Sequence, residues 1–493
     1  MGTGNRLIAN IFAYGVGGIA VKVISFFLLP VFTNYLTPED YGTISLLISM
    51  SDFFAILFMT GFSTAAGAYY FESNEQNHRA KVIWSYFTLL TVFGAGFVIT
   101  GYILAEKISW LLFVSDRYVY LVKISLITTL FSLLIDPFGV YLKLEQKART
   151  FTILMVITTF LTVALNLLMV VVLQCGARGM IESISFSRGV GVLLMMGSVI
   201  FGFSLRYVFS LDTAITLFKS GLPLLPSSIF MFVMAENVKY VSQYKSGLDT
   251  VGLYQVGMNL ALPIYIAVNS FVSAWLPFFM TYMHDQDSAR YVLARWTTYY
   301  IAGFGAIALM FFVWAKPVVY LMTQPAYTSA YKVIGLIATG HFLLGVFYLL
   351  SPPMYYAREL TARIPVQLGA VVLGILLSLI LIPGYGLVGA GLAFAGGYMI
   401  QVILLILWNF YRRKKYISIP YEWRKLGFTM SFFVLIAFLT VLRWDLPMGI
   451  YDIMVSAVIT VIVTSYLILI MGKDIYEKIL MAYLQQIRYK FRR

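Results

Sequence analysis

The chain is a succession of apolar stretches of roughly 20 residues separated by short polar loops, and this pattern restricts the fold more than any other feature. An α-helix needs about 20 apolar residues to cross a bilayer. Only 11% of the 493 residues are charged, whereas soluble proteins carry roughly 25%. We therefore predict an all-α polytopic membrane protein without a soluble domain. About fourteen transmembrane helices are expected, at residues 7–33, 42–69, 82–105, 119–142, 151–174, 180–203, 217–241, 252–282, 291–322, 331–356, 364–382, 387–411, 424–444 and 450–471.

The positive charge of the chain is distributed as membrane topology requires. A net charge of +14 could indicate a nucleic-acid partner, but one set of alternate loops and termini carries 24 lysines and arginines and the opposite set carries 7. Positively charged loops stay in the cytoplasm. The sequence thus predicts two cytoplasmic termini and no nucleic-acid partner. Residues 473–493 are expected to form a basic amphipathic helix on the cytoplasmic surface.

Short motifs recur at an offset close to 210 residues. Residues 41–45 resemble 251–255, residues 145–149 resemble 359–363, and residues 176–179 resemble 386–389. The repeat predicts two pseudo-symmetric six-helix lobes, at 1–210 and 211–415. Two extra helices at 416–472 and the tail at 473–493 follow them. Because both lobes begin on the same side of the membrane, the repeat is parallel and the substrate path is expected at the lobe interface.

Lys22 lies in the middle of the first apolar stretch. A lysine near the bilayer centre costs at least about 2.5–3.5 kcal/mol on insertion scales. Two interpretations remain open: Lys22 pairs with a carboxylate to stabilise the fold, or it lines a water-filled pathway for an anionic substrate.

Polar side chains also interrupt the second, seventh and eighth predicted helices. Together with Lys22, they are the predicted substrate-binding residues of a cavity: Ser45, Ser49 and Asp52; Glu236 and Lys239; Gln255 and Asn259. Positions 45 and 49 match 255 and 259 at the repeat offset, which suggests two matching walls. Glu236 and Lys239 are neighbours on a helix surface. The alternatives are that this pair only neutralises itself and that Asp52 is a structural partner of Lys22.

A second group of ionisable residues lies elsewhere in the apolar stretches. Asp136, Glu182 and Arg188 are expected either to pair inside the first lobe or to extend the pathway and couple an ion. His341 either titrates near neutral pH or is a hydrogen-bonded packing residue.

Nothing in the sequence indicates an enzyme. It lacks HExxH, Walker and GxGxxG motifs. Its one cysteine, Cys175, and its three distant histidines cannot form a cysteine cluster or an evident metal site. The carboxylates have no spacing that indicates acid–base catalysis. We expect no catalytic residues, no metal and no cofactor.

The segment FLLPVFTNYLTPEDYG, the matching half that begins at the seventh helix, and the Glu-x-x-Ala-Arg turns resemble a known family. They are similar to the polysaccharide flippases, the Wzx-type members of the multidrug/oligosaccharidyl-lipid/polysaccharide exporter superfamily. The resemblance implies a V of two six-helix lobes around a cavity lined by helices 1, 2, 7 and 8. It also implies that Lys22 and Lys239 meet a pyrophosphate-linked sugar, and that the last two helices contact the polyprenyl chain.

The function implied by the resemblance is a flippase of the bacterial inner membrane. It would move undecaprenyl-diphosphate-linked oligosaccharide units of an O-antigen, capsule or exopolysaccharide by alternating access. The absence of an arginine cluster in the first two helices argues against lipid II as the substrate. Membrane lipids, a polysaccharide polymerase and chain-length machinery are the expected partners of a monomer. The alternatives are a cation-coupled multidrug exporter of the same superfamily and a membrane polysaccharide polymerase.

Overall fold

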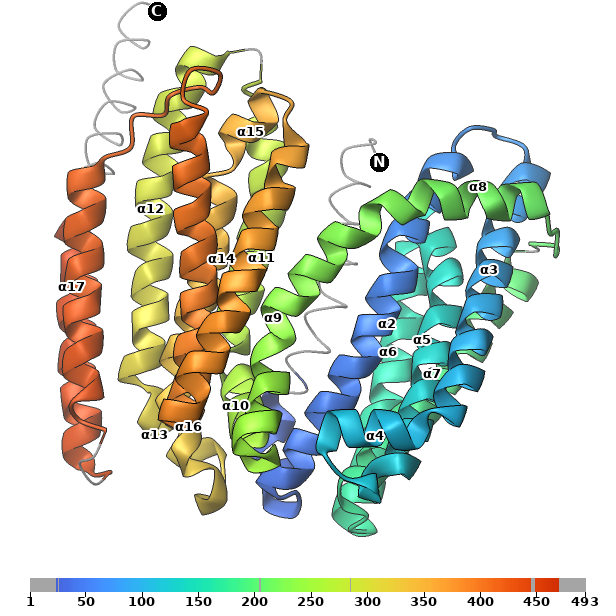
Figure 1. The fold of residues 1–493 in the computed structure, drawn as a ribbon, viewed down its shortest axis with the longest axis horizontal. Coiled ribbons are helices and arrows are strands. Elements are labelled where there is room, and N and C mark those ends of the chain that lie inside the picture. The colour runs from blue at the N-terminus through green and yellow to red at the C-terminus, as the bar shows by residue number, and fades with distance from the viewer. Residues whose placement is uncertain (1–23, 25, 204, 284, 445–447, 470–493) are drawn as a thin grey trace, which may run out of the picture. The chain divides into compact units, whose positions relative to one another are not determined.

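The computed structural model describes residues 24, 26–203, 205–283, 285–444 and 448–469, which form helices and no strand (Figure 1). Eleven of these helices are long and apolar enough to cross a membrane, and Phe26–Tyr35 is a shorter apolar helix. The predicted all-α polytopic fold is confirmed. The count of fourteen stays a prediction, because the first span lies mostly outside the described residues and Arg363–Tyr411, counted here as one helix, has a kink at Gly386 between two predicted spans.

Helix α2 (Pro38–Tyr70) shows how the sequence fixes a helix start. Thr37 accepts a hydrogen bond from the Asp40 amide, and the Asp40 carboxylate accepts one from the Thr37 amide at 3.0 Å. This reciprocal capping box satisfies two backbone donors that a helix leaves unpaired. Pro38 occupies the first turn, where a missing N–H costs nothing. Glu39 and Asp40 thus lie in the first turn of the helix, which begins four residues before the expected start at 42.

The described residues divide into two compact units. Unit 1 comprises residues up to Asn259 together with Thr323–Tyr327 and Ile375–Ala390. Within it, α2 and α5 pack against each other and each contacts both α3 and α7, α6 packs on α7, and α8 and α9 contact α2. Figure 1 shows this bundle in blue to green. Its further helices are α3 (Gln76–Ile103), α4 (Ala105–Phe113), α5 (Val119–Leu144), α6 (Ala148–Asn166), α7 (Gly176–Gly197), α8 (Leu211–Gly221), α9 (Leu225–Ser246) and α10 (Leu248–Leu260).

Large apolar side chains from several helices fill the interior of unit 1. Phe62 of α2, Tyr86 of α3, Leu133 of α5 and Leu217 of α8 are at most 1% exposed and belong to one cluster. Burial of such side chains contributes about 1.5–3 kcal/mol each in water. In a membrane, the same contacts act through close packing instead. The cluster holds α2 in the middle of the unit, where it can present polar residues to its neighbours.

Unit 2 contains the remaining described residues. Helix α12 contacts α14 and α17, and α14 contacts α11 and α13. Buried apolar side chains of α12, α17 and the final helical segment 450–469 form a hydrophobic cluster in this unit. The helices are α11 (Leu262–Met280), α12 (Gln286–Val313), α13 (Ala315–Met322), α14 (Tyr331–Leu349), α15 (Pro352–Tyr356), α16 (Arg363–Tyr411) and α17 (Trp423–Val441); the Ile375–Ala390 part of α16 belongs to unit 1.

A buried ionic contact attaches the last described helix to the rest of unit 2. The Asp452 carboxylate lies 2.9 Å from Arg443 and 4.0 Å from the Lys316 ammonium. Asp452 and Lys316 are both buried. Because an uncompensated buried charge is costly, these three residues fix the segment 450–469 against α13 and the end of α17.

Two predicted spans were wrong. The stretch 217–241 is divided at Leu222–Leu224, where Pro223 lies between α8 and α9. The stretch 252–282 breaks at Ala261, because Pro263 in the first turn of α11 cannot donate a backbone hydrogen bond. The predicted break between 364–382 and 387–411 is present inside α16, where the backbone of Gly386 is not helical and has a φ of 54°. Gly176, 210 positions earlier, has a φ of 57°, and glycine adopts this conformation without the cost of a Cβ.

The predicted lobe limits and the predicted tail helix stay predictions. Lys22 and residues 473–493 lie outside the described residues.

Candidate functional site

Three helices of unit 1 bring together polar side chains that the sequence places far apart. We call this group the polar cluster. It comprises Ser45, Ser49 and Asp52 of α2, Glu236, Lys239 and Tyr240 of α9, and Gln255 and Asn259 of α10.

A first set of contacts converges on the Glu236 carboxylate. The Lys239 ammonium lies 2.7 Å from Glu236 Oε2, and Ser49 donates a hydrogen bond of 2.8 Å to the same oxygen. Tyr240 in turn donates to Ser49 at 3.1 Å. The Lys239 side chain is 9% exposed and that of Glu236 is 19% exposed. Separating a charge pair this protected from water would leave two uncompensated buried charges. The pair is therefore held in one geometry.

A second set of contacts joins equivalent positions of the predicted repeat. Ser45 donates a hydrogen bond of 2.8 Å to Gln255 Oε1, and these residues are 210 positions apart. The Gln255 amide then donates to Asn259 at 2.9 Å. Two matching polar stripes thus meet directly at this level of α2 and α10.

Two glycines let α2 and α10 approach closely beside these contacts. A Cβ added to Gly42 would overlap the carbonyl oxygen of Leu248, and one added to Gly252 would overlap the carbonyl oxygen of Pro38. Both glycines and both carbonyls are related by the offset of 210. Backbones this close need residues without side chains, so the crossing is specified by the sequence at both positions.

Asp52 is the accessible carboxylate of the polar cluster. Its side chain is exposed and lies within electrostatic range of Arg188, Glu236 and Lys239. Arg188 of α7 is not a member of the polar cluster, but its charge and that of Lys239 together balance the two carboxylates. Lys22, the remaining predicted cavity residue, lies outside the described residues.

The second predicted group does not assemble. Asp136 accepts a hydrogen bond of 2.6 Å from Tyr86, and Arg188 donates to Ser132. Glu182 binds Arg178 at 2.8 Å. The contacts lie inside unit 1, but they join Asp136, Glu182 and Arg188 to other residues rather than to one another.

His341 is buried in unit 2 between aromatic rings. Its ring centroid lies 5.0 Å from that of Tyr265 and 5.3 Å from that of Phe394. These surroundings suit a packing residue.

Sequence reasoning missed Tyr240 and a contact between α9 and α16 in this region. Tyr240 lies four residues after Glu236, and that spacing alone could have indicated it. The contact between Ser378 and the Asn237 Oδ1, at 2.7 Å, joins α16 to α9. It had no sequence signal, because the two residues are 141 positions apart.

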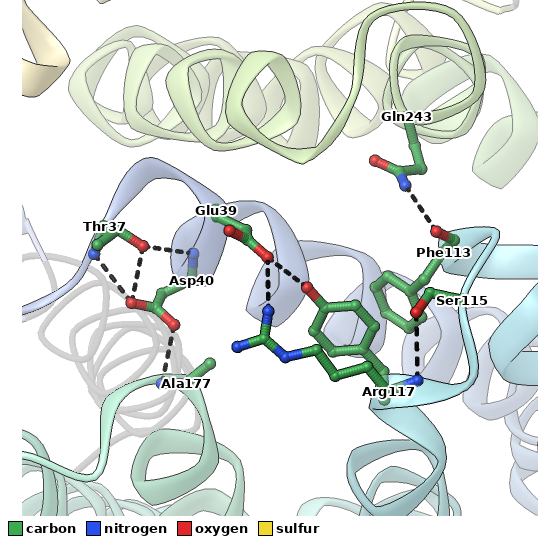
Figure 2. Close-up of polar contacts among 9 residues, drawn as sticks. Thr37, Glu39, Asp40, Phe113, Ser115, Arg117, Ala177 and Gln243 are labelled. Carbon is green, nitrogen blue, oxygen red and sulfur yellow. Dashed lines mark hydrogen bonds and ion pairs between the residues drawn. The ribbon is translucent and has the colours of Figure 1, made fainter.

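The acidic first turn of α2 contacts the ends of neighbouring helices (Figure 2). Asp40 accepts a hydrogen bond of 3.4 Å from the Ala177 amide at the start of α7. Glu39 lies 3.6 Å from the Arg117 guanidinium. Gln243 of α9 donates to the carbonyl of Phe113 at the end of α4. A carboxylate at a helix N-terminus is favoured by the helix dipole, so Asp40 stabilises both α2 and α7.

Within the described ranges, no group of three or more His, Cys, Asp or Glu side chains is arranged to hold a metal ion. The polar cluster offers hydrogen-bond donors and acceptors, and its charges are balanced by the nearby Arg188. This chemistry suits reversible binding of a polar group.

Comparison with known proteins places these features in context. The model of a family described as "Polysaccharide biosynthesis protein" matches residues 7–283. The succinoglycan biosynthesis transport protein ExoT of Rhizobium meliloti (strain 1021) is 21% identical over 327 residues. The match covers 65% of this chain and 63% of ExoT, so the chain spans less than two thirds of that relative.

Two solved structures share the fold. The lipid II flippase MurJ in an inward closed conformation aligns with a TM-score of 0.73 and 15% identity, over 94% of this chain and 99% of MurJ. An inward-facing multidrug resistance transporter of the MATE family, in the MOP superfamily, aligns with a TM-score of 0.68 and 13% identity. That match covers 81% of this chain and 98% of the transporter.

Proposed function

Since this chain belongs to the polysaccharide biosynthesis protein family, we propose that it is a flippase for lipid-linked oligosaccharides. It moves undecaprenyl-diphosphate-linked repeat units of an O-antigen, capsule or exopolysaccharide across the bacterial inner membrane. The relatives named for transport and flipping support a transporter over an enzyme.

The observation that carries this proposal is the polar cluster on α2, α9 and α10. Membrane-spanning helices hold ionisable and hydrogen-bonding residues at a cost, and such residues mark substrate pathways by default. Ser45, Ser49, Gln255 and Asn259 present the hydroxyl and amide groups that suit sugar hydroxyls. A sugar would exchange their mutual hydrogen bonds for bonds to itself.

Charge gives Lys22 its proposed role. The charges of Asp52 and Glu236 are balanced by Lys239 of the polar cluster and by Arg188 of α7, which lies within electrostatic range of Asp52. An additional cation at position 22 would therefore make the pathway attractive to a diphosphate. In this proposal, Lys22 binds the anionic head and the serine and amide groups bind the sugars.

We further propose the topology and mechanism that follow from the sequence. Both termini lie in the cytoplasm, and two six-helix lobes rock to expose the path to each side in turn. The protein acts as a monomer and delivers its product to a polysaccharide polymerase with its chain-length machinery.

The test is the lipid content of a strain that lacks this protein. Lipids are extracted and identified by mass, and the leaflet of each precursor is assayed in spheroplasts. We expect a complete oligosaccharide unit to accumulate on the cytoplasmic side and to be cleared when the intact gene is restored. Normal precursor levels on both sides would contradict the proposal.

A cation-coupled multidrug exporter is the second candidate. The fold shared with a multidrug transporter and the accessible carboxylate of Asp52 favour it. In that case, the deletion strain would become sensitive to cationic dyes without accumulating precursor.

A further inference from the structure

Unit 1 also contains an apolar pocket beside the polar cluster. Its volume is about 310 Å³, within the range of about 300–1,000 Å³ that is typical of ligand sites. It opens between α2, α4 and α9. The lining residues are Met50, Phe53 and Phe54 of α2, Ile108, Leu111 and Leu112 of α4, and Phe232 and Tyr240 of α9.

The pocket and the polar cluster share a residue. Tyr240 lines the pocket with its ring, while its hydroxyl donates to Ser49 in the cluster. Met50 and Phe53 of the pocket are the chain neighbours of Ser49 and Asp52. A single molecule with a polar head and a hydrocarbon chain could therefore occupy the two sites at once.

The residues that line the pocket carry no charge, and Tyr240 is the one among them with a polar side-chain atom. Transfer of an unpaired polar group into such surroundings costs roughly 2–7 kcal/mol, and a charge costs more. The pocket therefore selects a hydrocarbon and rejects the sugars and the diphosphate. The polar cluster and the apolar pocket thus match the polar head and the hydrocarbon chain of a lipid-linked saccharide.

A ladder of phenylalanine rings continues from the pocket along the seam between α2 and α3. The ring centroids of Phe54 and Phe97 are 4.0 Å apart, and those of Phe58 and Phe93 are 6.0 Å apart. The ring of Phe93 also stacks on that of Phe218 of α8, with 5.5 Å between the centroids. All five rings are half-buried. They thus present a continuous, partly accessible apolar surface that connects the pocket to α8.

We propose that this apolar pocket is a hydrocarbon subsite, which holds the chain of a polar-headed lipid substrate while the head occupies the polar cluster. The inference rests on the proposed function, because a lipid-linked substrate supplies both parts. It assigns chain binding to α2, α4 and α9. The last two helices, which by resemblance to the family would contact the polyprenyl chain, do not line this pocket.

Photo-crosslinking tests the subsite directly. The full-length protein carries p-benzoyl-phenylalanine in place of Leu111 or, as a matched control, Ile103. These side chains are 73% and 77% exposed, and Ile103 does not line the pocket. Each variant is reconstituted in vesicles of phosphatidylethanolamine and phosphatidylglycerol with a trace of radiolabelled undecaprenyl diphosphate.

We expect label at position 111 to exceed label at 103 by about tenfold, and excess unlabelled undecaprenyl diphosphate to abolish the difference. Equal label at both positions would mean contact with the bulk bilayer and would overturn the proposal. So would label at 111 that phosphatidylglycerol competes as well as the polyprenyl lipid does.

A bulky substitution provides a second readout in the deletion strain. Leu111→Trp should narrow the pocket and leave precursor on the cytoplasmic side, whereas Ile103→Trp should clear it normally. Normal clearance of precursor by L111W, together with no specific label, would refute the subsite and leave the flippase proposal unaffected. Specific label at 111, with no precursor accumulation in the deletion strain, would support a lipid subsite and reject the flippase proposal.

Discussion

The buried pair of Glu236 and Lys239 yields the sharpest prediction of the structure. The two charges are 2.7 Å apart and largely protected from solvent. Glu236→Gln removes the counter-charge from a buried ammonium, and breaking a buried pair in this way costs about 3–5 kcal/mol. Asp52 lies within electrostatic range of Lys239 and compensates in part. We therefore expect a loss near about 3 kcal/mol in the free energy of unfolding.

The double variant separates stability from function. Replacing both members of a buried pair by neutral groups is often close to neutral for stability. Glu236→Gln with Lys239→Met should therefore be within about 1 kcal/mol of the wild type, with a coupling energy of at least about 2 kcal/mol. Ser49 keeps a hydrogen-bond acceptor in the glutamine, so the neighbouring contact survives.

The assay has two parts. Equilibrium unfolding of the purified variants in mixed micelles with increasing SDS gives the free energies, and precursor clearance in the deletion strain gives transport. We expect the double variant to regain stability but to clear precursor at least about tenfold more slowly, because a lost binding energy of about 1.4 kcal/mol is a factor of ten. A double variant that regains both would reduce the pair to a structural role. A loss below about 1 kcal/mol in Glu236→Gln would refute the electrostatic reasoning itself.

Three further predictions use the same unfolding assay. Gly252→Val should lower the free energy of unfolding by about 1–3 kcal/mol, because the new side chain overlaps a carbonyl of the first turn of α2. Gly96→Ala is the control. No atom lies near the new Cβ at that site, so this change should not destabilise the protein. Asp40→Ala should lower the free energy of unfolding by about 1–2 kcal/mol through lost capping of α2 and α7. Asp40→Asn should keep most of this stabilisation. Hydrogen bonds from Lys415, Arg412 and Tyr416 lower the pKa of Glu359 from 4.5 to about 2. The contact therefore stabilises the folded state fully above pH 4.5, and this stabilisation is lost as pH falls towards 2. In Glu359→Gln, the free energy of unfolding should depend less on pH in this range. An unchanged pH dependence would exclude the contact as its cause.

Much of the fold could be predicted from the sequence because its signals are local. A run of about 20 apolar residues can satisfy its backbone in a bilayer by forming a helix, so the spans were found without knowledge of their neighbours. The predicted spans that failed did so at helix breaks. Pro223 and Pro263 act on the backbone of one residue, whereas apolar periodicity averages over a whole turn.

The candidate site was partly predictable for a different reason. The offset of 210 aligned Ser45 with Gln255, and the structure places them 2.8 Å apart. Spacing along a helix likewise predicted that Glu236 and Lys239 are neighbours. Partners from unrelated segments had no such signal, and Asp136 pairs with Tyr86 instead of the expected charged residues.

The sequence alone determined an all-α membrane protein with polar residues on particular helices, because hydropathy and helical spacing are properties of consecutive residues. Only the tertiary structure decided which of those residues meet and which apolar surfaces border them. The pocket between α2, α4 and α9 exists because helices distant in the chain leave a space of about 310 Å³ beside Tyr240. Such a space depends on how side chains from three segments fill the volume between them, and no single segment carries that information.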